Sequence, residues 1–463
     1  MLEAFKKKHF YGPGGIMELL PIAIPMFLSS MFDMLMMLID RLFLSHVGIV
    51  HQAAAMGGGM TSWMCVTLFV GVVGYASALV AQYYGAGQRQ NCVSVVWQAL
   101  RLSAISYPIV LLGGFLVIRF GKVFDSHSAL ERMLETRYFW YMTFGSIISH
   151  SRFALGSFFS GIGRTRIILV ANSIALFVNI IANWLLIFGH WGFPRLELDG
   201  AAIGTLLSGL ATVTVLAVAF FLMTRLPEYR GHKLRAFNKE HLWKLIRYGV
   251  PQGTENLLAM IAFVVMIANF HRYGDDMAAA TTIAFNWDGL SFHPLIGIQV
   301  AVTTLVGQAM GKENPELAVR VSHSGFKVAI VYAACMVVTY MSIPHLLVGF
   351  FTPESSGLDY TQVREYAIPM LRLVGFYLIT DAVQMISSAV LRGAGDTFWS
   401  MVIIFCRDWG TASVIVVCVH LLAFGPLQTW TALVVMAVLF SAPIFLRYKI
   451  GHWKKLRIIK SSR

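Results

Sequence analysis

Long apolar runs follow one another along nearly the whole chain, and polar residues are confined mainly to the segments between them. An apolar helix needs about 20 residues to cross a bilayer core of about 30 Å. Twelve runs meet this requirement, so the pattern predicts twelve transmembrane helices. We place them near residues 16–46, 54–82, 94–118, 135–160, 165–189, 199–223, 242–270, 277–310, 318–350, 366–391, 396–420 and 426–447.

The composition agrees with this pattern. Hydrophobic residues make up 57% of the chain and charged residues only 13%, whereas a soluble domain carries about 25% charged residues. The first apolar run contains three acidic residues and no small-residue cleavage site follows it, so we predict an uncleaved first span. The five cysteines have no paired spacing, which favours neither a zinc site nor a disulfide framework, and we expect no cofactor. The predicted fold class is an all-α polytopic membrane protein.

The net charge of +13 is distributed unevenly. Basic residues gather at residues 6–8, 225–247 and 447–463, while loops on the other side carry at least as many acids as bases. The positive-inside rule then predicts cytoplasmic N- and C-termini and a cytoplasmic central linker in a multi-pass plasma (inner) membrane protein. The excess of basic residues therefore indicates the orientation of the chain in the membrane. We expect the lipid bilayer as a partner and no nucleic acid.

Two stretches of the sequence occur twice. Val80-Ala-Gln82-Tyr-Tyr-Gly85 recurs as Val306-Gly-Gln308-Ala-Met-Gly311, an offset of 226 residues. Gly161-Ile-Gly163-Arg-Thr165 recurs as Gly393-Ala-Gly395-Asp-Thr397, an offset of 232 residues. A repeat this long in an apolar chain indicates a duplicated half-protein, which is typical of secondary transporters.

Each predicted half contains six spans, an even number, so both halves enter the membrane in the same orientation. We therefore predict two parallel-repeat six-helix bundles, with lobes of residues 1–230 and 231–463. The polar linker from Arg225 to His241 is expected to be a solvated hinge. Glycines inside spans, including Gly57-Gly58-Gly59, favour close helix packing, with a kink or hinge as the alternative.

Ionisable and amide residues inside the first-half spans are candidate ion ligands. Asp33 and Asp40 lie seven residues apart, which places both on one face of the first helix. A charge at the bilayer centre costs about 3 kcal/mol on insertion scales, so such groups usually mark an ion or substrate path. We predict cation coupling at Asp40 and a substrate-binding role for Asp33. Pairing with a basic residue is the structural alternative.

An asparagine stripe of Asn172, Asn179 and Asn183 follows in the fifth span, and Thr205 follows in the sixth. A carboxylate with amide and hydroxyl oxygens offers the ligands that a hard cation prefers. We predict that Asn179, Asn183 and Thr205 join Asp40 in cation coupling and that Asn172 contacts substrate. Monovalent Na⁺ at Asp40, Asn179 and Asn183 is one alternative; interhelical hydrogen bonding by the asparagines is another.

The second half has its own polar set. Asp381 lies in the tenth span, with Tyr377 and Gln384 on the same face and no basic residue within a turn. We predict cation coupling at Asp381 and Glu255, and substrate binding at Asp288, Tyr377 and Gln384. Arg407 and Asp408 in the eleventh span are expected to be structural ions that pair with neighbouring groups. The histidines show no spacing typical of a metal site.

A buried carboxylate can carry a proton in place of a charge, or bind Na⁺ when it is ionised. Either ion then competes with a cationic or amphipathic substrate for one negatively charged cavity. This competition is a sufficient physical basis for antiport.

At this point the sequence resembles the multidrug and toxic compound extrusion (MATE) family over nearly its whole length. The resemblance rests on the following motifs in order: Leu20-Pro-Ile-Ala-Ile-Pro25, Ile39-Asp-Arg-Leu-Phe43, Val80-Ala-Gln82-Tyr-Tyr-Gly85-Ala-Gly87, Asn179-Ile-Ile-Ala-Asn183-Trp-Leu-Leu-Ile-Phe188-Gly189, Gly200-Ala-Ala-Ile-Gly-Thr205, Gly249-Val-Pro251, Asp381-Ala-Val-Gln384 and Leu391-Arg-Gly-Ala-Gly-Asp-Thr397. It implies two six-helix bundles that export organic cations or amphipathic drugs in exchange for H⁺ or Na⁺.

The resemblance also implies site residues. In some relatives a first-lobe ion site combines an Asp, an Asn-x-x-x-Asp pair and a Thr, and the matching positions here look like Asp40, Asn179, Asn183 and Thr205. Asn183 is an amide where those relatives have a carboxylate, which favours proton coupling over Na⁺ coupling. Other relatives use a Glu in the seventh span and an Asp in the tenth. Asp381 looks like the match for that Asp, whereas Glu255 lies about one turn before the position of that Glu.

Other functions remain as alternatives. The runner-up is a lipid-linked saccharide flippase of the same wider superfamily. A membrane-embedded enzyme would need a histidine or metal cluster, so we predict that the protein is not an enzyme. A channel or receptor is compatible with hydropathy alone, but the duplicated halves favour alternating access. The expected partners are small-molecule substrates, and the protein is expected to be a monomer.

Overall fold

The computed structural model describes residues 11–121, 128–231, 235–351 and 360–459. Within these ranges the chain is helical except for short connections, and no strand occurs. The basic residues Lys6, Lys7, Lys8, Lys233, Lys460 and Arg463, which contribute to the predicted topology, lie outside the described residues.

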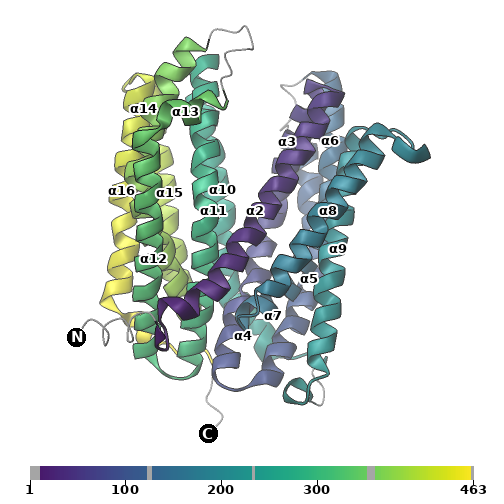
Figure 1. The fold of residues 1–463 in the computed structure, drawn as a ribbon, viewed down its shortest axis with the longest axis vertical. Helices are drawn as coiled ribbons and strands as arrows, with labels where there is room; N and C mark the ends of the chain where they lie inside the picture. The colour runs from purple at the N-terminus through teal and green to yellow at the C-terminus, as the bar shows by residue number, and fades with distance from the viewer. Residues whose placement is uncertain (1–10, 122–127, 232–234, 352–359, 460–463) are drawn as a thin grey trace. The chain divides into compact units, whose positions relative to one another are not determined.

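The helices follow the predicted spans closely (Figure 1). Those of the first half are α2 (Ile16–Val47), α3 (Ile49–Gly74), α4 (Ala76–Gly85), α5 (Arg89–Phe120), α6 (Ala129–Phe144), α7 (Ser146–Gly161), α8 (Arg166–Phe188) and α9 (Leu198–Thr224). Those of the second half are α10 (Lys239–His271), α11 (Asp275–Gly311), α12 (Pro315–Ser342), α13 (Pro344–Gly349), α14 (Thr361–Ala394), α15 (Thr397–His420) and α16 (Pro426–Ile450). Short 3₁₀ turns are η2 (His190–Gly192), η3 (Pro227–Tyr229) and η5 (His452–Lys455).

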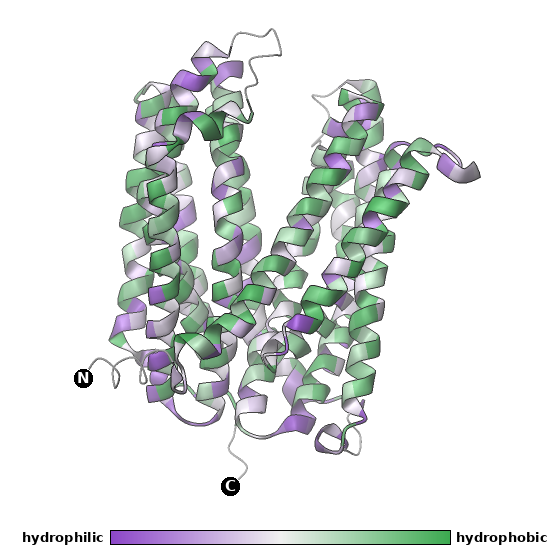
Figure 2. Cartoon of the chain, in the orientation of Figure 1, coloured by the Kyte–Doolittle hydropathy of each residue, from purple (hydrophilic) through white to green (hydrophobic). Residues whose placement is uncertain are grey.

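The fold class is confirmed. Eleven helical segments among the described residues are long and apolar enough to cross a membrane. The predicted fourth span is divided at Gly145 into α6 and α7, each of 16 residues, so neither is long enough alone. Apolar residues cover much of the long helices, while many hydrophilic residues lie at helix ends and in connections (Figure 2).

The chain forms two compact units. The N unit comprises Ile24–Asn256, Gly307–Glu313 and Ile458–Arg463, and the C unit comprises Met1–Ala23, Leu257–Val306 and Asn314–Arg457. The chain thus passes from one unit to the other inside α2, α10 and α11. The predicted lobes, residues 1–230 and 231–463, were defined by the sequence repeat and not by compactness. They stay a prediction.

Each unit has its own helix packing. In the N unit, α8 packs on α9, α3 packs on α6, and α7 packs on α4 and α5. Aromatic rings of Phe158, Phe159 and Phe220 fill a buried core there. In the C unit, α14 packs against α12 and α16, and α15 packs against α16. Burying these apolar faces leaves polar side chains at a few helix contacts, where the candidate site residues lie.

The two copies of the Gln-x-x-Gly motif cross each other within the N unit. A Cβ atom at Gly85 would lie 2.0 Å from the carbonyl oxygen of Gln308, and one at Gly311 would lie 2.0 Å from the carbonyl oxygen of Gln82. The Gln308 side chain also donates a hydrogen bond to the carbonyl oxygen of Gly161 at 2.9 Å. Only glycine permits this approach, because any side chain would overlap the backbone of the facing helix.

The described part of the linker between the halves is largely exposed, as expected of a solvated segment, and it is also hydrogen-bonded to α5. Gln98 and Arg101 of α5 donate to the carbonyl oxygen of Ala236 at 3.0 and 2.8 Å. Gln90 donates to the carbonyl oxygen of Arg230 at 2.5 Å, and Tyr229 is buried. The linker is thus both exposed and anchored to α5 through its backbone carbonyls, and composition alone does not reveal this anchoring.

Replacing Gly85 by alanine should destabilise the protein. The new methyl group would overlap the Gln308 backbone, and overpacking of this kind typically costs about 1–3 kcal/mol. We expect Gly85→Ala to lower the melting temperature of the purified protein in detergent. The matched control is Gly113→Ala, since nothing lies within 4 Å of a Cβ atom at Gly113. An unchanged melting temperature for Gly85→Ala would contradict the close crossing.

Candidate functional site

Asp40 of α2 lies where α8 and α9 meet it in the N unit. One carboxylate oxygen accepts a hydrogen bond from the Asn183 amide, and the other accepts one from the Thr205 hydroxyl at 3.1 Å. The Thr205 hydroxyl also lies 3.0 Å from the carbonyl oxygen of Ala201, so two acceptors compete for its single proton. The structure therefore brings together Asp40, Asn183 and Thr205, as the sequence predicts.

Asn179 lies beside the Asp40 carboxylate, one turn before Asn183 on α8. Neither atom of its amide meets hydrogen-bond geometry among the described residues, and the amide oxygen of Asn183 is also buried without a partner. A Cβ atom at Gly204 would lie 2.1 Å from that Asn183 oxygen, so the glycine provides space for it. Two buried amide oxygens thus lie near the carboxylate with capacity to bind a cation or a hydrogen-bond donor.

Two buried polar groups of α6 are not among the predicted site residues, and one of them lies beside Asp40. Tyr138 is buried and interacts with Asp40 and Thr205. Glu135, only 1% exposed, packs against α3 so closely that a Cβ atom at Gly57 would lie 2.2 Å from its carboxylate. The sequence signal was available, since Glu135 opens a predicted span. The glycine run that makes room for it is the one that the sequence predicts to favour close helix packing.

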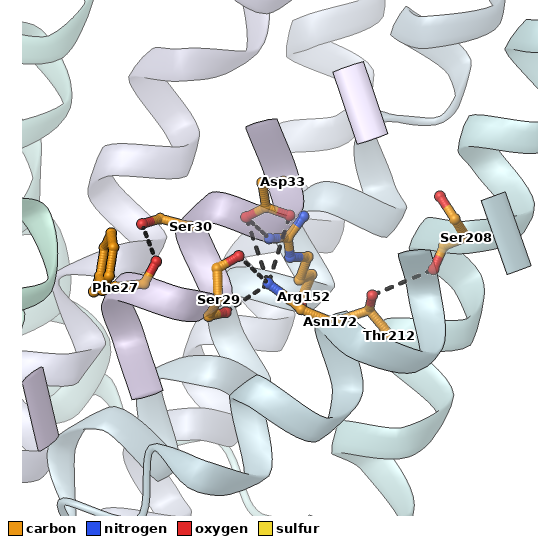
Figure 3. A network of polar contacts seen from close by, with 8 residues as sticks. All are labelled: Phe27, Ser29, Ser30, Asp33, Arg152, Asn172, Ser208 and Thr212. Atoms are coloured by element: carbon orange, nitrogen blue, oxygen red, sulfur yellow. Dashed lines mark hydrogen bonds and ion pairs between the residues drawn. The ribbon is translucent and has the colours of Figure 1, made fainter. Parts of the chain in front are cut away.

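Asp33 and Asn172 also lie where α2 meets α8, closer to the N-terminus of each helix than Asp40 and Asn179 (Figure 3). Arg152 of α7 forms an ion pair with Asp33 at 2.5 Å. Asn172 donates a hydrogen bond to the Ser29 hydroxyl at 2.7 Å, and its amide nitrogen lies 3.5 Å from both Asp33 oxygens. Asp33 and Asp40 thus share a helix face, but among the described residues only Asp33 has a basic partner. The substrate-binding roles of Asp33 and Asn172 stay predictions.

In the C unit, Asp381 of α14 forms an ion pair with Arg407 of α15. Arg407 also lies 3.5 Å from the Asp408 carboxylate. The expectation that Arg407 pairs with neighbouring acids is thus confirmed. Asp381 has no basic residue within a turn on its own helix, as the sequence shows. Its basic partner comes from a different helix, so the view that Asp381 is unpaired is wrong. A search within one helical turn cannot detect a counter-charge from a different helix.

Asp288 of α11 is the second acidic group near Asp381. It accepts a hydrogen bond from the Tyr377 hydroxyl and lies within electrostatic range of Asp381 and Arg407. Its Oδ1 atom is buried and has no hydrogen-bond partner among the described residues; the same is true of the Gln384 amide oxygen. The predicted grouping of Asp288 and Tyr377 with Asp381 is therefore a real cluster in the structure.

Glu255 and the Asp288–Asp381 cluster belong to different compact units. Glu255 lies on α10, is 5% exposed, and belongs to the N unit, whereas Asp288 and Asp381 belong to the C unit. Its predicted coupling role stays a prediction.

The family model MatE matches residues 25–185 and again residues 251–416. The chain belongs to the MatE family. The two matches begin 226 residues apart, which is the offset of the Gln-x-x-Gly repeat. The duplication seen in the sequence is therefore a property of the family model as well.

Two relatives of this MatE protein span almost its full length. One is a protein described as "Probable multidrug resistance protein NorM" from Thermotoga maritima, with 24% identity over 96% of this chain and 95% of the relative. A protein of the same description from Geobacillus kaustophilus is 27% identical over 95% of each chain.

Solved structures share the fold. A MATE protein in complex with MaL6 superposes with a TM-score of 0.84 at 21% identity and covers 95% of this chain and 96% of the other. A MOP superfamily transporter from Pyrococcus furiosus, described as having a binding pocket of reverse polarity, also gives a TM-score of 0.84, at 22% identity and with the same coverage of both chains. At these identities the likeness establishes the fold alone.

A double-mutant cycle should detect the Asp33–Arg152 ion pair. Arg152→Ala leaves the Asp33 carboxylate without its counter-charge, whereas Asp33→Asn together with Arg152→Ala removes both charges. We expect the two changes to be non-additive in thermal unfolding, with a coupling energy of about 0.5–3 kcal/mol. The control cycle combines Arg152→Ala with Ser173→Ala, because the Ser173 hydroxyl bonds to the backbone of its own helix. Additivity at Asp33 and Arg152 would show that the pair contributes nothing to stability.

Proposed function

We propose that this protein is a secondary active efflux antiporter, which exports organic-cation or amphipathic compounds in exchange for H⁺, or alternatively Na⁺, by alternating access. Membership of the MatE family and the multidrug-resistance description of its relatives support export of small molecules. The duplicated halves support alternating access, which is the usual mechanism of transporters built from repeats. Accordingly, the protein is proposed to be a transporter and not an enzyme.

The observation that carries this proposal is the environment of Asp40. Its carboxylate lies inside a membrane-spanning helix and has no basic partner among the described residues. Its neighbours are Asn183, Thr205, Asn179 and Tyr138. An ionised carboxylate in such a place is costly unless a cation or a proton neutralises it. The site is thus suited to bind an ion reversibly, which a permanent arginine partner would prevent.

The choice of ion follows from the ligands. The site offers one carboxylate and the amide oxygens of Asn179 and Asn183, hence a single negative charge. A proton needs only the carboxylate, whereas Na⁺ needs several oxygens arranged around it. We propose H⁺ as the main coupling ion because Asn183 supplies an amide and not a second negative charge.

A proton on Asp40 would also rearrange the hydrogen bonds around it. The ionised carboxylate accepts from both Asn183 and Thr205. A protonated carboxyl group gains one O–H donor and keeps part of its acceptor capacity, so the contact at the protonated oxygen can change from accepting to donating. The Ala201 carbonyl already lies within reach of Thr205 at 3.0 Å. Proton binding can therefore shift the contacts between α2 and α9, which is the kind of change that alternating access requires.

The remaining assignments belong to the same proposal. Substrate binding is assigned to Asp33, Asn172, Asp288, Tyr377 and Gln384, and a further coupling role to Asp381 and Glu255. We propose that the protein is a monomer in the inner membrane, with both termini in the cytoplasm.

Removing the Asp40 charge should abolish coupled transport. In proteoliposomes with an imposed pH or Na⁺ gradient, we expect Asp40→Asn to lose gradient-driven movement of a fluorescent cation such as ethidium, by about tenfold or more. Asp275→Asn, which removes an exposed acid at the start of α11, is the control for loss of one carboxylate. Transport by Asp40→Asn at the rate of the unchanged protein would contradict coupling at this site.

Adding a carboxylate at Asn183 should change the ion. Asn183→Asp places a second negative charge beside Asp40, so the site gains attraction for Na⁺. We expect a Na⁺ gradient to drive more transport in this variant, relative to a pH gradient, than in the unchanged protein. Asn183→Ala separates the effect of the charge from the loss of the amide. The same ion dependence in Asn183→Asp and the unchanged protein would exclude residue 183 from ion selection.

A further inference from the structure

The stretch of residues 225–247, which joins α9 to α10 in the N unit, carries more positive charge than its acids balance. Its two acidic residues already have cationic partners, since Glu228 lies 3.6 Å from Arg89 and Glu240 lies 2.7 Å from Lys244. Five basic residues of the stretch are exposed and form no ion pair among the described residues; they are Arg225, Arg230, Arg235, Lys239 and Arg247. Acids of the same stretch therefore do not balance their charge.

The backbone that carries three of these cations is held in place. Arg101 of α5 donates hydrogen bonds to the carbonyl oxygens of Arg235 and Ala236. At the start of α10, the Asn238 side chain accepts a hydrogen bond from the backbone N–H of His241 at 3.0 Å. An ordered backbone presents its side chains to a ligand at a lower entropic cost than a flexible basic tail does.

Exposed aromatic side chains alternate with the unpaired cations. Phe221 near the end of α9 is 41% exposed, Phe237 is 63% exposed and Trp243 is 59% exposed. The Arg235 guanidinium lies 5.8 Å from the centre of the Phe221 ring and 5.3 Å from that of the Trp97 ring. A guanidinium over ring faces keeps its N–H groups available, because they point outward in its own plane. Arg235 can therefore still donate hydrogen bonds to an anion.

Three side chains of α10 continue this surface. Lys239, Trp243 and Arg247 follow one another at intervals of four residues, so they are neighbours on one exposed face of the helix. Lys239 is the first residue of α10, where the helix dipole disfavours a positive charge. An anion beside Lys239 would be attracted both by this side chain and by the positive end of the helix.

Unpaired cations that alternate with exposed aromatic rings fit an anionic phospholipid. Phosphate oxygens pair with Lys and Arg side chains, and a polybasic segment next to a membrane-spanning helix attracts anionic lipids. Exposed Trp at the ends of membrane-spanning helices lies at the level of the lipid headgroups. A water-soluble polyanion would match the cations but would leave the aromatic side chains without a role.

We propose that one surface of the N unit binds the headgroups of anionic phospholipids, such as phosphatidylglycerol. The cations of this surface are Arg235, Lys239 and Arg247, and its aromatic residues are Phe221, Phe237 and Trp243. The cations hold the lipid phosphate, while the aromatic rings contact the glycerol and the upper acyl chains. This inference goes beyond the proposed function, because it depends on neither the coupling ion nor the exported compound.

Brominated lipids test the proposal, because bromine in an acyl chain quenches tryptophan fluorescence only at close contact. The full-length protein is reconstituted in phosphatidylcholine vesicles that contain increasing fractions of brominated phosphatidylglycerol or brominated phosphatidylcholine. A Trp243→Phe protein is measured in parallel, and the difference between the two gives the signal of Trp243. Each Lys or Arg near an anionic surface contributes about fivefold to binding. We therefore expect half-maximal quenching of Trp243 at a fraction of brominated phosphatidylglycerol about tenfold or more below that of brominated phosphatidylcholine.

Removing the cations should remove this preference. With Arg235→Gln, Lys239→Gln and Arg247→Gln combined, we expect the two brominated lipids to quench Trp243 equally. Arg247→Gln alone should lower the preference by up to about fivefold, whereas Arg247→Lys keeps the charge and should retain most of it. The matched control is Arg272→Gln, which removes an exposed arginine at the opposite end of α10 and should leave the preference unchanged. Added salt should weaken the preference, because it screens exposed charges.

Three results would overturn the proposal. They are equal quenching of Trp243 by both lipids in the unchanged protein, an undiminished preference in the folded triple variant, and an equal loss in Arg247→Gln and Arg272→Gln. Melting temperature and elution as a single species identify variants that do not fold. The single variants decide the question if the triple variant does not fold. These measurements use no ion gradient, so failure of the proposed antiport would leave this inference standing.

Discussion

A carboxylate inside a membrane-spanning helix has no water to solvate it, so the protein itself must supply whatever stabilises its charge. This chain meets the constraint in two ways. Asp33 and Asp381 each face an arginine from a neighbouring helix. Among the described residues Asp40 and Asp288 form no ion pair, and their hydrogen-bond donors are neutral, an amide with a hydroxyl in one case and a phenol in the other. An arginine fixes the charge permanently, whereas neutral donors leave it available to a proton, a metal ion or a substrate.

Close helix packing is what makes these neutral sites possible. Glycine at position 204 allows the Asn183 amide to lie against the α9 backbone, and glycine at position 57 does the same for Glu135. Larger residues would separate the helices and admit lipid or other side chains. The glycines that the sequence identifies as packing residues therefore also make room for buried polar side chains.

The sequence predicts the helices well because an apolar run of bilayer length has few alternative structures. Two predicted spans, 54–82 and 135–160, each comprise two helices, divided by one residue at Tyr75 and at Gly145, and hydropathy alone does not reveal such short breaks. Residues on one helix face were also predictable, and Asp40 does meet Asn183 and Thr205. Contacts such as Asp381 with Arg407 were not, because helical periodicity defines which residues share a face but not which face of another helix lies opposite.

The internal repeat shows which features duplication retained and which diverged. The Gln-x-x-Gly backbone crossing uses equivalent residues of both copies, so this contact depends on the symmetry of the repeat. Charged positions do not follow it. In the repeated Gly-x-Gly-x-Thr motif, Asp396 forms an ion pair with Arg447 at 2.8 Å, whereas its counterpart Arg164 lies 3.9 Å from the Met223 sulfur. Packing between equivalent helices constrains both copies alike, but a charge needs only a local partner. The halves can therefore keep one scaffold while their charged groups diverge.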